Sequence, residues 1–408
     1  MSRSVVITGV GALTPIGNSR EDFWDSLVES RCGIKHFDKL DTLDIPVQKA
    51  GFIDDFKAGE HIEGINFRRL PRFSQFIIAS VDMAIKDSGI RIDSIAPEKR
   101  GLIFNTINGP VDVTIKFLET LYLKGPQAVS PLKFAQTVMN AAAAPISIKN
   151  RLEGMGTVTS GLSSIITAYE YVKDGRADMM VAGGADAFGS NLDVFKTCSN
   201  HKMLATKNGS VEEGSRPADV LRNGNVMGEG AGMVVLESKE QAISRGATIY
   251  AEIVGYGITH DNNAVKKSNE RTAEPIEKAV EFALQDAKIT SDEIHYINAL
   301  ANSSVGIDYA EAVALRNAFP NILTIPVSTY KGHTGEISGA GDALGVIQTA
   351  LSIKYQKIAP ICGLKQIDPE CGLNYVRTAP KSHDIHYALS NSMEVGGNTQ
   401  AIILKHVN

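Results

Sequence analysis

The sequence predicts an α/β fold made of two related halves that follow one another along the chain. Three features recur in the same order: a strand-like run ending in Gly-x-Gly, the end of a helix-patterned stretch, and a glycine-rich loop leading into an apolar strand. They lie at 5–11 and 251–257, at 84–90 and 283–289, and at 228–236 and 396–404. Strands alternating with helices favour a layered fold, and strands without a polar side favour mostly parallel order within each half. We predict an N-terminal half over 1–248 and a C-terminal half over 249–408.

The helices are predicted from apolar residues that recur with the helical period. One stretch places Phe73 and Phe76 on its apolar face, and its counterpart begins at Thr272 with Pro275 in the first turn. A further helix is predicted over 160–172, where leucine, isoleucine, tyrosine and valine share one face.

Composition excludes several classes of function. The net charge of −5 over 408 residues and the lack of a long basic run speak against nucleic acid as a partner. The four cysteines form no CxxC pair and none has zinc-ligand spacing to a histidine, so we expect no metal. The N-terminal apolar run is short and broken by glycine, and no apolar run reaches the length of a membrane span. We therefore expect a cytoplasmic protein with no membrane segment.

A string of sixteen letters, RNGNVMGEGAGMVVLE at 222–237, resembles the β-ketoacyl-acyl-carrier-protein synthases, and the elongating type in particular. Other stretches resemble the same family in the same order along the chain, at 5–17, 125–131, 177–185, 215–217, 245–257 and 327–341. The resemblance implies a five-layered αβαβα thiolase fold, an obligate dimer and a buried acyl tunnel. It also implies a cysteine nucleophile at the start of a buried helix, two histidines and a lysine, and it implies no cofactor.

All three of the reacting side chains that the family uses are replaced in this chain. The nucleophile position holds Val158, fixed by the Thr-Ser-Gly that follows it, and the two histidine positions hold Leu300 and Glu336. The lysine position is retained as Lys331, and Glu311 matches an acidic position of the family. Valine offers no nucleophilic atom, and a carboxylate disfavours the enolate that decarboxylation creates. We expect the chain to be inactive by itself, with Glu336 and Lys331 forming an ion pair in the degenerate site.

The loop that gates the site in the family also departs from the pattern. Its two aromatic positions hold Met393 and Val395, and Glu394 takes the place of a flexible glycine. Because these changes surround one cavity while the scaffold motifs persist, the divergence is concentrated at the site.

Two surfaces are predicted from the resemblance. A tunnel or interface face is expected at Asn108, Val111, Thr114, Ile115 and Leu118, which share one side of a helix. Ordinary interface packing is the alternative for these residues.

A basic cluster near a helix start is the second predicted surface. Arg68, Arg69 and Arg72 are placed to meet an acidic acyl carrier protein that holds its chain on phosphopantetheine. A solvated helix start is the alternative.

Three functions fit a ketosynthase-like chain with a dead site. The first is a chain-length factor that pairs with an active ketosynthase paralogue in a heterodimer, as in type II polyketide synthases, and limits the length of the chain made on the carrier protein. The second is a stand-alone malonyl-thioester decarboxylase, which the loss of both histidines disfavours. The third is a homodimeric pseudo-enzyme that binds a carrier protein or a lipid. The sequence favours the first.

Overall fold

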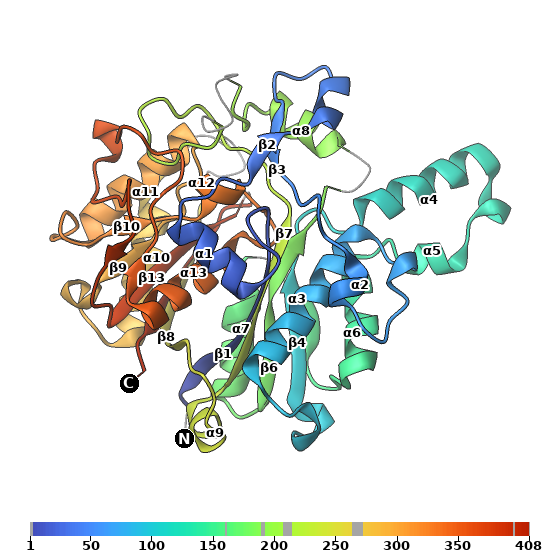
Figure 1. Ribbon diagram of the computed structural model, residues 1–408, viewed down its shortest axis with the longest axis horizontal. Coiled ribbons are helices and arrows are strands. Elements are labelled where there is room, and N and C mark those ends of the chain that lie inside the picture. Colours follow the sequence, from blue (N-terminus) through green and yellow to red (C-terminus); the bar gives the residue numbers. More distant parts are fainter. Residues whose placement is uncertain are drawn as a thin grey trace.

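The computed structural model describes residues 3–159, 161–188, 192–206, 214–262, 272–394 and 396–407. Its main feature is a ten-stranded sheet in the order β10-β9-β13-β14-β8-β1-β7-β6-β4-β5 (Figure 1). The strands of the N-terminal half are β1 (Val5–Leu13), β7 (Gly230–Ser238), β6 (Met179–Asp186), β4 (Arg100–Asn105) and β5 (Gly156–Thr159). Those of the C-terminal half are β8 (Ala251–His260), β14 (Asn398–Lys405), β13 (Tyr387–Met393), β9 (Tyr296–Asn298) and β10 (Val327–Ser328).

The strand order confirms that the two halves are related. Reading outward from the β1–β8 junction, each half has its first strand, then its last, and then three strands whose spatial order is the same in both. The junction itself is short, because β1 and β8 pair only from Val5 opposite Ile253 to Ile7 opposite Ala251. The boundary between residues 248 and 249 stays a prediction.

The expectation of mostly parallel order is wrong, because two of the four strand pairs in each half are antiparallel. In the N-terminal half these are β1–β7 and β7–β6, and in the C-terminal half β8–β14 and β14–β13. A strand buried on both faces is equally apolar whichever way its neighbours run. Direction is set by the connection, and the turn at 394–397 that joins β13 to β14 is too short for a parallel crossover.

Helices cover both outer faces and fill the middle of the molecule. The bounds of the longer helices are α1 (Arg20–Val28), α3 (Arg72–Ser88), α4 (Val111–Lys124), α6 (Ala143–Asn150), α7 (Ser163–Lys173), α8 (Asp193–Asn200), α10 (Ala273–Ala287), α11 (Val305–Ala318) and α13 (Gly341–Tyr355). The shorter ones are α2 (Ala58–His61), α5 (Pro131–Ala135), α9 (Lys239–Ser244) and α12 (Lys331–Thr334). Two small hairpin-like pairs, β2 (Ile34–His36) with β3 (Lys49–Gly51) and β11 (Lys357–Ile358) with β12 (Lys381–Ser382), lie outside the main sheet.

The layers follow the expected αβαβα order. Helix α3 packs on β1, β7 and β6, while α10 packs on β8 and β14 with α11 beside it. Helices α7 and α13 share the central apolar core, which both halves of the sheet contribute to (Figure 1). Helix α13 is buried around nearly its whole circumference, and its polar residues Gln348, Thr349 and Ser352 are buried with it. Within the described part of the chain, no helix combines the length and the apolar run needed to cross a membrane.

Candidate functional site: a degenerate ketosynthase centre

The position of the lost nucleophile lies at the end of the edge strand β5. Val158 pairs with Phe104 of β4 and packs, half-buried, against the apolar core beneath α3. Gly161 then takes a left-handed conformation with φ of +54° and leads into α7. The helix begins three residues later than the sequence predicted, and residue 160 lies outside the described part of the chain.

The first histidine position is occupied by a buried leucine whose backbone is held by a carboxylate. Leu300 follows β9 and is 3% exposed. Its N–H and that of Ala301 donate to Glu311 of α11 over 2.7 and 2.9 Å, and Asn391 Nδ2 donates to the same carboxylate over 3.1 Å. Burial raises the pKa of Glu311, and these hydrogen bonds oppose that effect. The retained glutamate therefore anchors a loop and accompanies no imidazole.

A second buried carboxylate fixes the rest of this loop. Asp308 accepts hydrogen bonds from the N–H groups of Asn302 and Ser303 over 2.9 and 3.2 Å. It also accepts one from Ala218 over 2.8 Å, and burial raises its pKa to about 6. Ser303 has a φ of +78°, which a non-glycine residue adopts only when its surroundings impose it. The scaffold of the site is thus intact around the missing histidine.

The second histidine position carries the ion pair expected from the sequence. Lys331 Nζ lies 2.9 Å from Glu336 Oε2, and the two side chains are 6% and 17% exposed. Asn302 Nδ2 donates to the same carboxylate oxygen over 3.0 Å. Burial lowers the pKa of Lys331, but the neighbouring Glu336 charge outweighs it and the pKa is raised. The Lys331 ammonium is therefore held against Glu336, and the pair offers no neutral donor to a thioester oxygen.

Neither nearby histidine replaces the lost ones. The His333 ring is fully buried, and its Nδ1 and Nε2 each lie 2.9 Å from a backbone carbonyl oxygen, those of Arg31 and Pro360. Burial lowers its pKa. His295 precedes β9, whereas Leu300 follows it, and the His295 ring contacts the His386 ring at 5.6 Å between centroids. Both histidines serve the structure.

Sequence reasoning singled out the gate loop but missed the residue that faces it. Met393 ends β13 and packs half-buried against a small apolar cluster formed by α10 and α11. Glu394 closes a tight turn in which its N–H donates to the Asn398 carbonyl over 2.9 Å. Val395 lies outside the described residues. The missed residue is Asp342 at the start of α13, whose pKa burial raises to about 6. Its only signal in the sequence is a lone acid inside an otherwise apolar helix.

The predicted tunnel helix stands away from the body of the protein. Helix α4 contains no fully buried residue and, with α5, projects from one side of the molecule (Figure 1). Asn108 lies in the turn before it, where its N–H donates to the buried Asp186 over 3.0 Å. Thr114 Oγ1 donates to the Thr137 carbonyl over 3.3 Å, which ties the two arms of the projection together. Val111 and Ile115 are half-buried and Leu118 is 40% exposed. Their tunnel-lining role stays a prediction.

The predicted basic cluster is divided by the structure. The Arg72 guanidinium lies 2.7 Å from Glu229 Oε1, a carboxylate that is 3% exposed, so Arg72 is occupied in an internal ion pair. Arg68 and Arg69 are exposed. Only these two remain available to an acidic partner, because leaving Glu229 without Arg72 would leave a buried charge unpaired.

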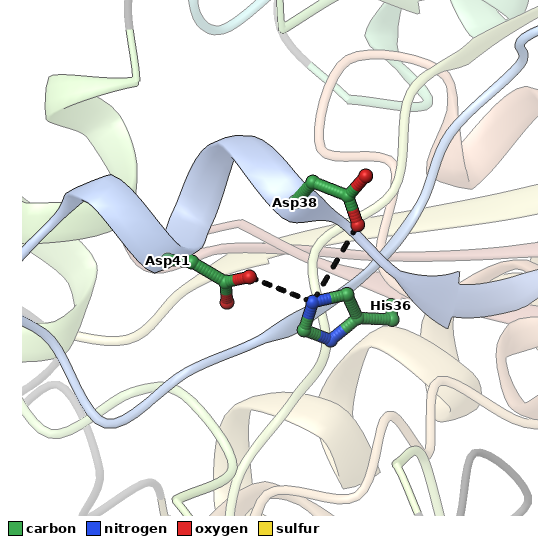
Figure 2. A group of neighbouring side chains, drawn as sticks. All are labelled: His36, Asp38 and Asp41. Atoms are coloured by element: carbon green, nitrogen blue, oxygen red, sulfur yellow. Dashed lines mark hydrogen bonds and ion pairs between the residues drawn. The ribbon is translucent and has the colours of Figure 1, made fainter.

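One group of side chains in the described part of the chain has metal-ligand spacing. His36 Nε2 lies 2.9 Å from Asp41 Oδ2 and 3.6 Å from Asp38 Oδ1 (Figure 2). All three side chains are exposed, Asp38 by 96%, so water competes for each of them. We assign no metal to this group.

Comparison with known proteins agrees with the fold and with the intact scaffold. The family model "Beta-ketoacyl synthase, N-terminal domain" matches residues 2–242, and "Beta-ketoacyl synthase, C-terminal domain" matches residues 250–365. The chain is 35% identical over 410 residues to 3-oxoacyl-[acyl-carrier-protein] synthase 2 of Staphylococcus aureus (strain COL), covering 99% of this chain and 98% of the relative. It is 32% identical over 413 residues to the enzyme of the same name from Synechocystis, again covering 99% and 98%.

Solved structures superpose along the whole chain. The ishigamide ketosynthase/chain length factor matches with a TM-score of 0.91 at 27% identity, covering 100% of both chains. A β-ketoacyl synthase from Burkholderia phymatum matches with a TM-score of 0.89 at 28% identity, also over 100% of both chains. A type II polyketide synthase acyl-carrier protein in complex with its ketosynthase matches with a TM-score of 0.91 over 100% of both chains, and at 24% identity it supports the fold alone. With the fold, the buried anchors and the motif order in agreement, this chain belongs to the β-ketoacyl synthase family.

Proposed function

We propose that this chain is the non-catalytic chain-length-factor subunit of a ketosynthase complex. One observation carries the proposal: the family scaffold is preserved throughout, while all three reacting positions are replaced, by Val158, Leu300 and Glu336. A decaying sequence would have lost buried anchors such as Glu311 and Asp308 as readily as the histidines. Selection has therefore kept the shape of a ketosynthase without its chemistry.

The projecting arm supports pairing with another subunit. Large apolar side chains are exposed along it, namely Leu118, Tyr122, Leu123, Leu132, Phe134, Val138 and Met139. Tyr122 and Leu123 are more than 80% exposed, and neighbouring apolar side chains left in water are typical of an interaction site. A partner that covers this arm would remove the unfavourable exposure of these apolar side chains to water.

The open edge of the sheet lies on the same half of the chain. At the other edge, β10 is covered because Val327 exchanges backbone hydrogen bonds with Asn374 and Val376. The edge strand β5 has no such cover among the described residues, and Gly156 is exposed. An uncovered edge strand pairs readily with another chain. A pair of two such chains would contain no nucleophile, so the reaction that the family performs requires an active ketosynthase as the partner.

Helix α4 is placed to set the length of the product. If the arm packs against the partner, Asn108 and the side of α4 that bears Val111, Thr114, Ile115 and Leu118 reach toward the partner's acyl tunnel. Replacing Ile115 by Trp would then shorten the main product of the complex, as measured by mass spectrometry of the released chains. The neighbouring exposed Lys116, replaced by Trp, is the matched control and should leave the product unchanged.

Native mass spectrometry tests the pairing directly. The chain is tagged and expressed together with the intact ketosynthase encoded nearest to it, and the purified complex is weighed. We expect a one-to-one heterodimer as the main species. A homodimer of this chain that ignores the ketosynthase would overturn the proposal, and malonyl-carrier-protein decarboxylation would be assayed next.

A further inference from the structure

A carboxylate from the gate loop lies against the first turn before α7. A β-carbon built on Gly161 would overlap Oε1 of Glu394 and would lie 3.0 Å from Oδ2 of Asp342. Glu394 Oε1 is shut off from solvent. Two acids that are distant in sequence, one from the gate loop and one from α13, therefore meet at the start of the helix that follows Val158.

A third acid and a base lie close to these two. A β-carbon on Gly341 would lie 3.0 Å from Glu336 Oε1, so Glu336 and Asp342 flank one glycine. Lys331 is the cation of this group, and its ammonium is already paired with Glu336 at 2.9 Å. Glu336 and Asp342 both attract this ammonium, and Glu394 lies beside Asp342 at Gly161. Burial raises the pKa of Asp342, Lys331 opposes the rise and Glu336 reinforces it.

The start of a helix is the place where a negative charge is best stabilised. Free N–H groups and the helix dipole attract anions there, which is how such a site lowers a thiol pKa or holds a developing oxyanion. Here a carboxylate of the chain itself lies beside Gly161, two residues before α7 begins. A substrate anion brought to the same point would meet Glu394 and Asp342 at close range, in a cavity where charges are weakly screened.

We propose that Glu394 decides what the degenerate site accepts: its carboxylate fills the space before α7 and excludes acyl thioesters, above all those that carry a malonyl carboxylate. This inference deepens the proposed non-catalytic role and rests on it. The Glu394 side chain therefore fills the site, which also lacks the reacting groups. In a complex, the acyl chain and its carrier thioester would be confined to the partner's centre, with no competing decarboxylation here.

Thiol labelling of a reporter cysteine tests the plug. Val158→Cys is made in the full-length chain and labelled with neutral iodoacetamide, and the rate is followed by mass spectrometry of the peptide that contains position 158. The exposed Cys32 provides an internal rate standard in the same sample. The rate is compared with that of Val158→Cys/Glu394→Gly, which removes the side chain, and of Val158→Cys/Glu394→Gln, which keeps its volume and removes its charge.

We expect the glycine variant to label at least tenfold faster than the parent Val158→Cys protein, and the glutamine variant to fall between them. Equal rates, within twofold, in all three proteins would overturn the proposal. Val158→Cys/Glu394→Ala, which removes most of the side chain but leaves the backbone of an ordinary residue, keeps the test decisive if the glycine variant does not fold. Labelling needs no partner: if no heterodimer forms, the proposed function fails while the labelling result still decides whether Glu394 is a plug.

Discussion

The buried ion pair between Lys331 and Glu336 gives the sharpest stability prediction. The two charged groups are 2.9 Å apart and nearly free of solvent. Two unit charges about 4 Å apart attract by about 4 kcal/mol at an effective dielectric constant of about 20. Removing one partner of a buried pair costs about 3–5 kcal/mol, because the other charge is left unpaired. We expect Glu336→Gln to cost about 3 kcal/mol, the lower end, because Asp342 also attracts Lys331.

The reverse change should cost at least as much. Lys331→Met leaves Glu336 and Asp342 close together without the ammonium that offsets their repulsion. The double variant should lose less stability than the sum of the two single losses, by at least about 1.5 kcal/mol. Each single variant leaves one buried charge unpaired, and the double variant leaves none.

Thermal unfolding of the purified protein measures these losses. For a chain of 408 residues, about 1 kcal/mol corresponds to a change in Tm of about 1 °C. Glu336→Gln should then lower Tm by about 3 °C. The matched control is the exposed pair of Lys57 and Glu60, 3.1 Å apart and 73% and 62% exposed, whose neutralisation should leave Tm nearly unchanged. Additive losses at 331 and 336 would refute the reasoning.

Three further predictions concern charge and burial. The pKa of Asp342 is raised from 3.8 to about 6 in the folded chain, so the stability due to its proton is present below about pH 4 and is lost as pH rises through 6. Relative to the parent, Asp342→Asn should therefore raise Tm more at pH 7 than at pH 5, and an equal difference at both would contradict this. His333→Ala should lower Tm by about 3 °C through the lost hydrogen bond from the ring to a backbone carbonyl and a cavity, with heterodimer assembly unchanged by native mass spectrometry. Arg68→Glu and Arg69→Glu should weaken the binding of acyl carrier protein in surface plasmon resonance and should also reduce the salt dependence of that binding. Arg72→Ala should lower Tm instead, because Arg72 is paired with the buried Glu229. Equal losses of binding for all three variants would argue against the division of the cluster.

The predicted loss of the reacting side chains rests on the sequence alone, because each of these positions sits in a short, recognisable local frame. Val158 is fixed by the three residues that follow it, Leu300 by the strand before it, and Glu336 by its distance from Lys331. The ion pair of Lys331 with Glu336 was predictable for the same reason, since the two residues are only five positions apart in the chain. Local spacing carries this information without any knowledge of the rest of the fold.

The direction of the strands and the fate of Arg72 were not predictable in this way. An apolar strand buried on both faces has no sequence mark of its neighbours' direction. Arg72 reads as one of three exposed cations, yet its partner Glu229 is 157 residues away in the chain. A pair of that kind is formed only when α3 packs beside the loop that precedes β7.

The sequence by itself thus determined the family and the two related halves, and it predicted the three missing side chains, because each depends on residues that are close along the chain. The tertiary structure alone decided that Glu394 and Asp342 meet at Gly161, and that the α4 arm stands exposed with its apolar side chains in water. Both features depend on which segments that are far apart in the sequence come into contact, and local sequence patterns do not encode such contacts. They depend on how the two halves of the sheet close around α7 and α13, and on which surfaces are left for a partner to cover.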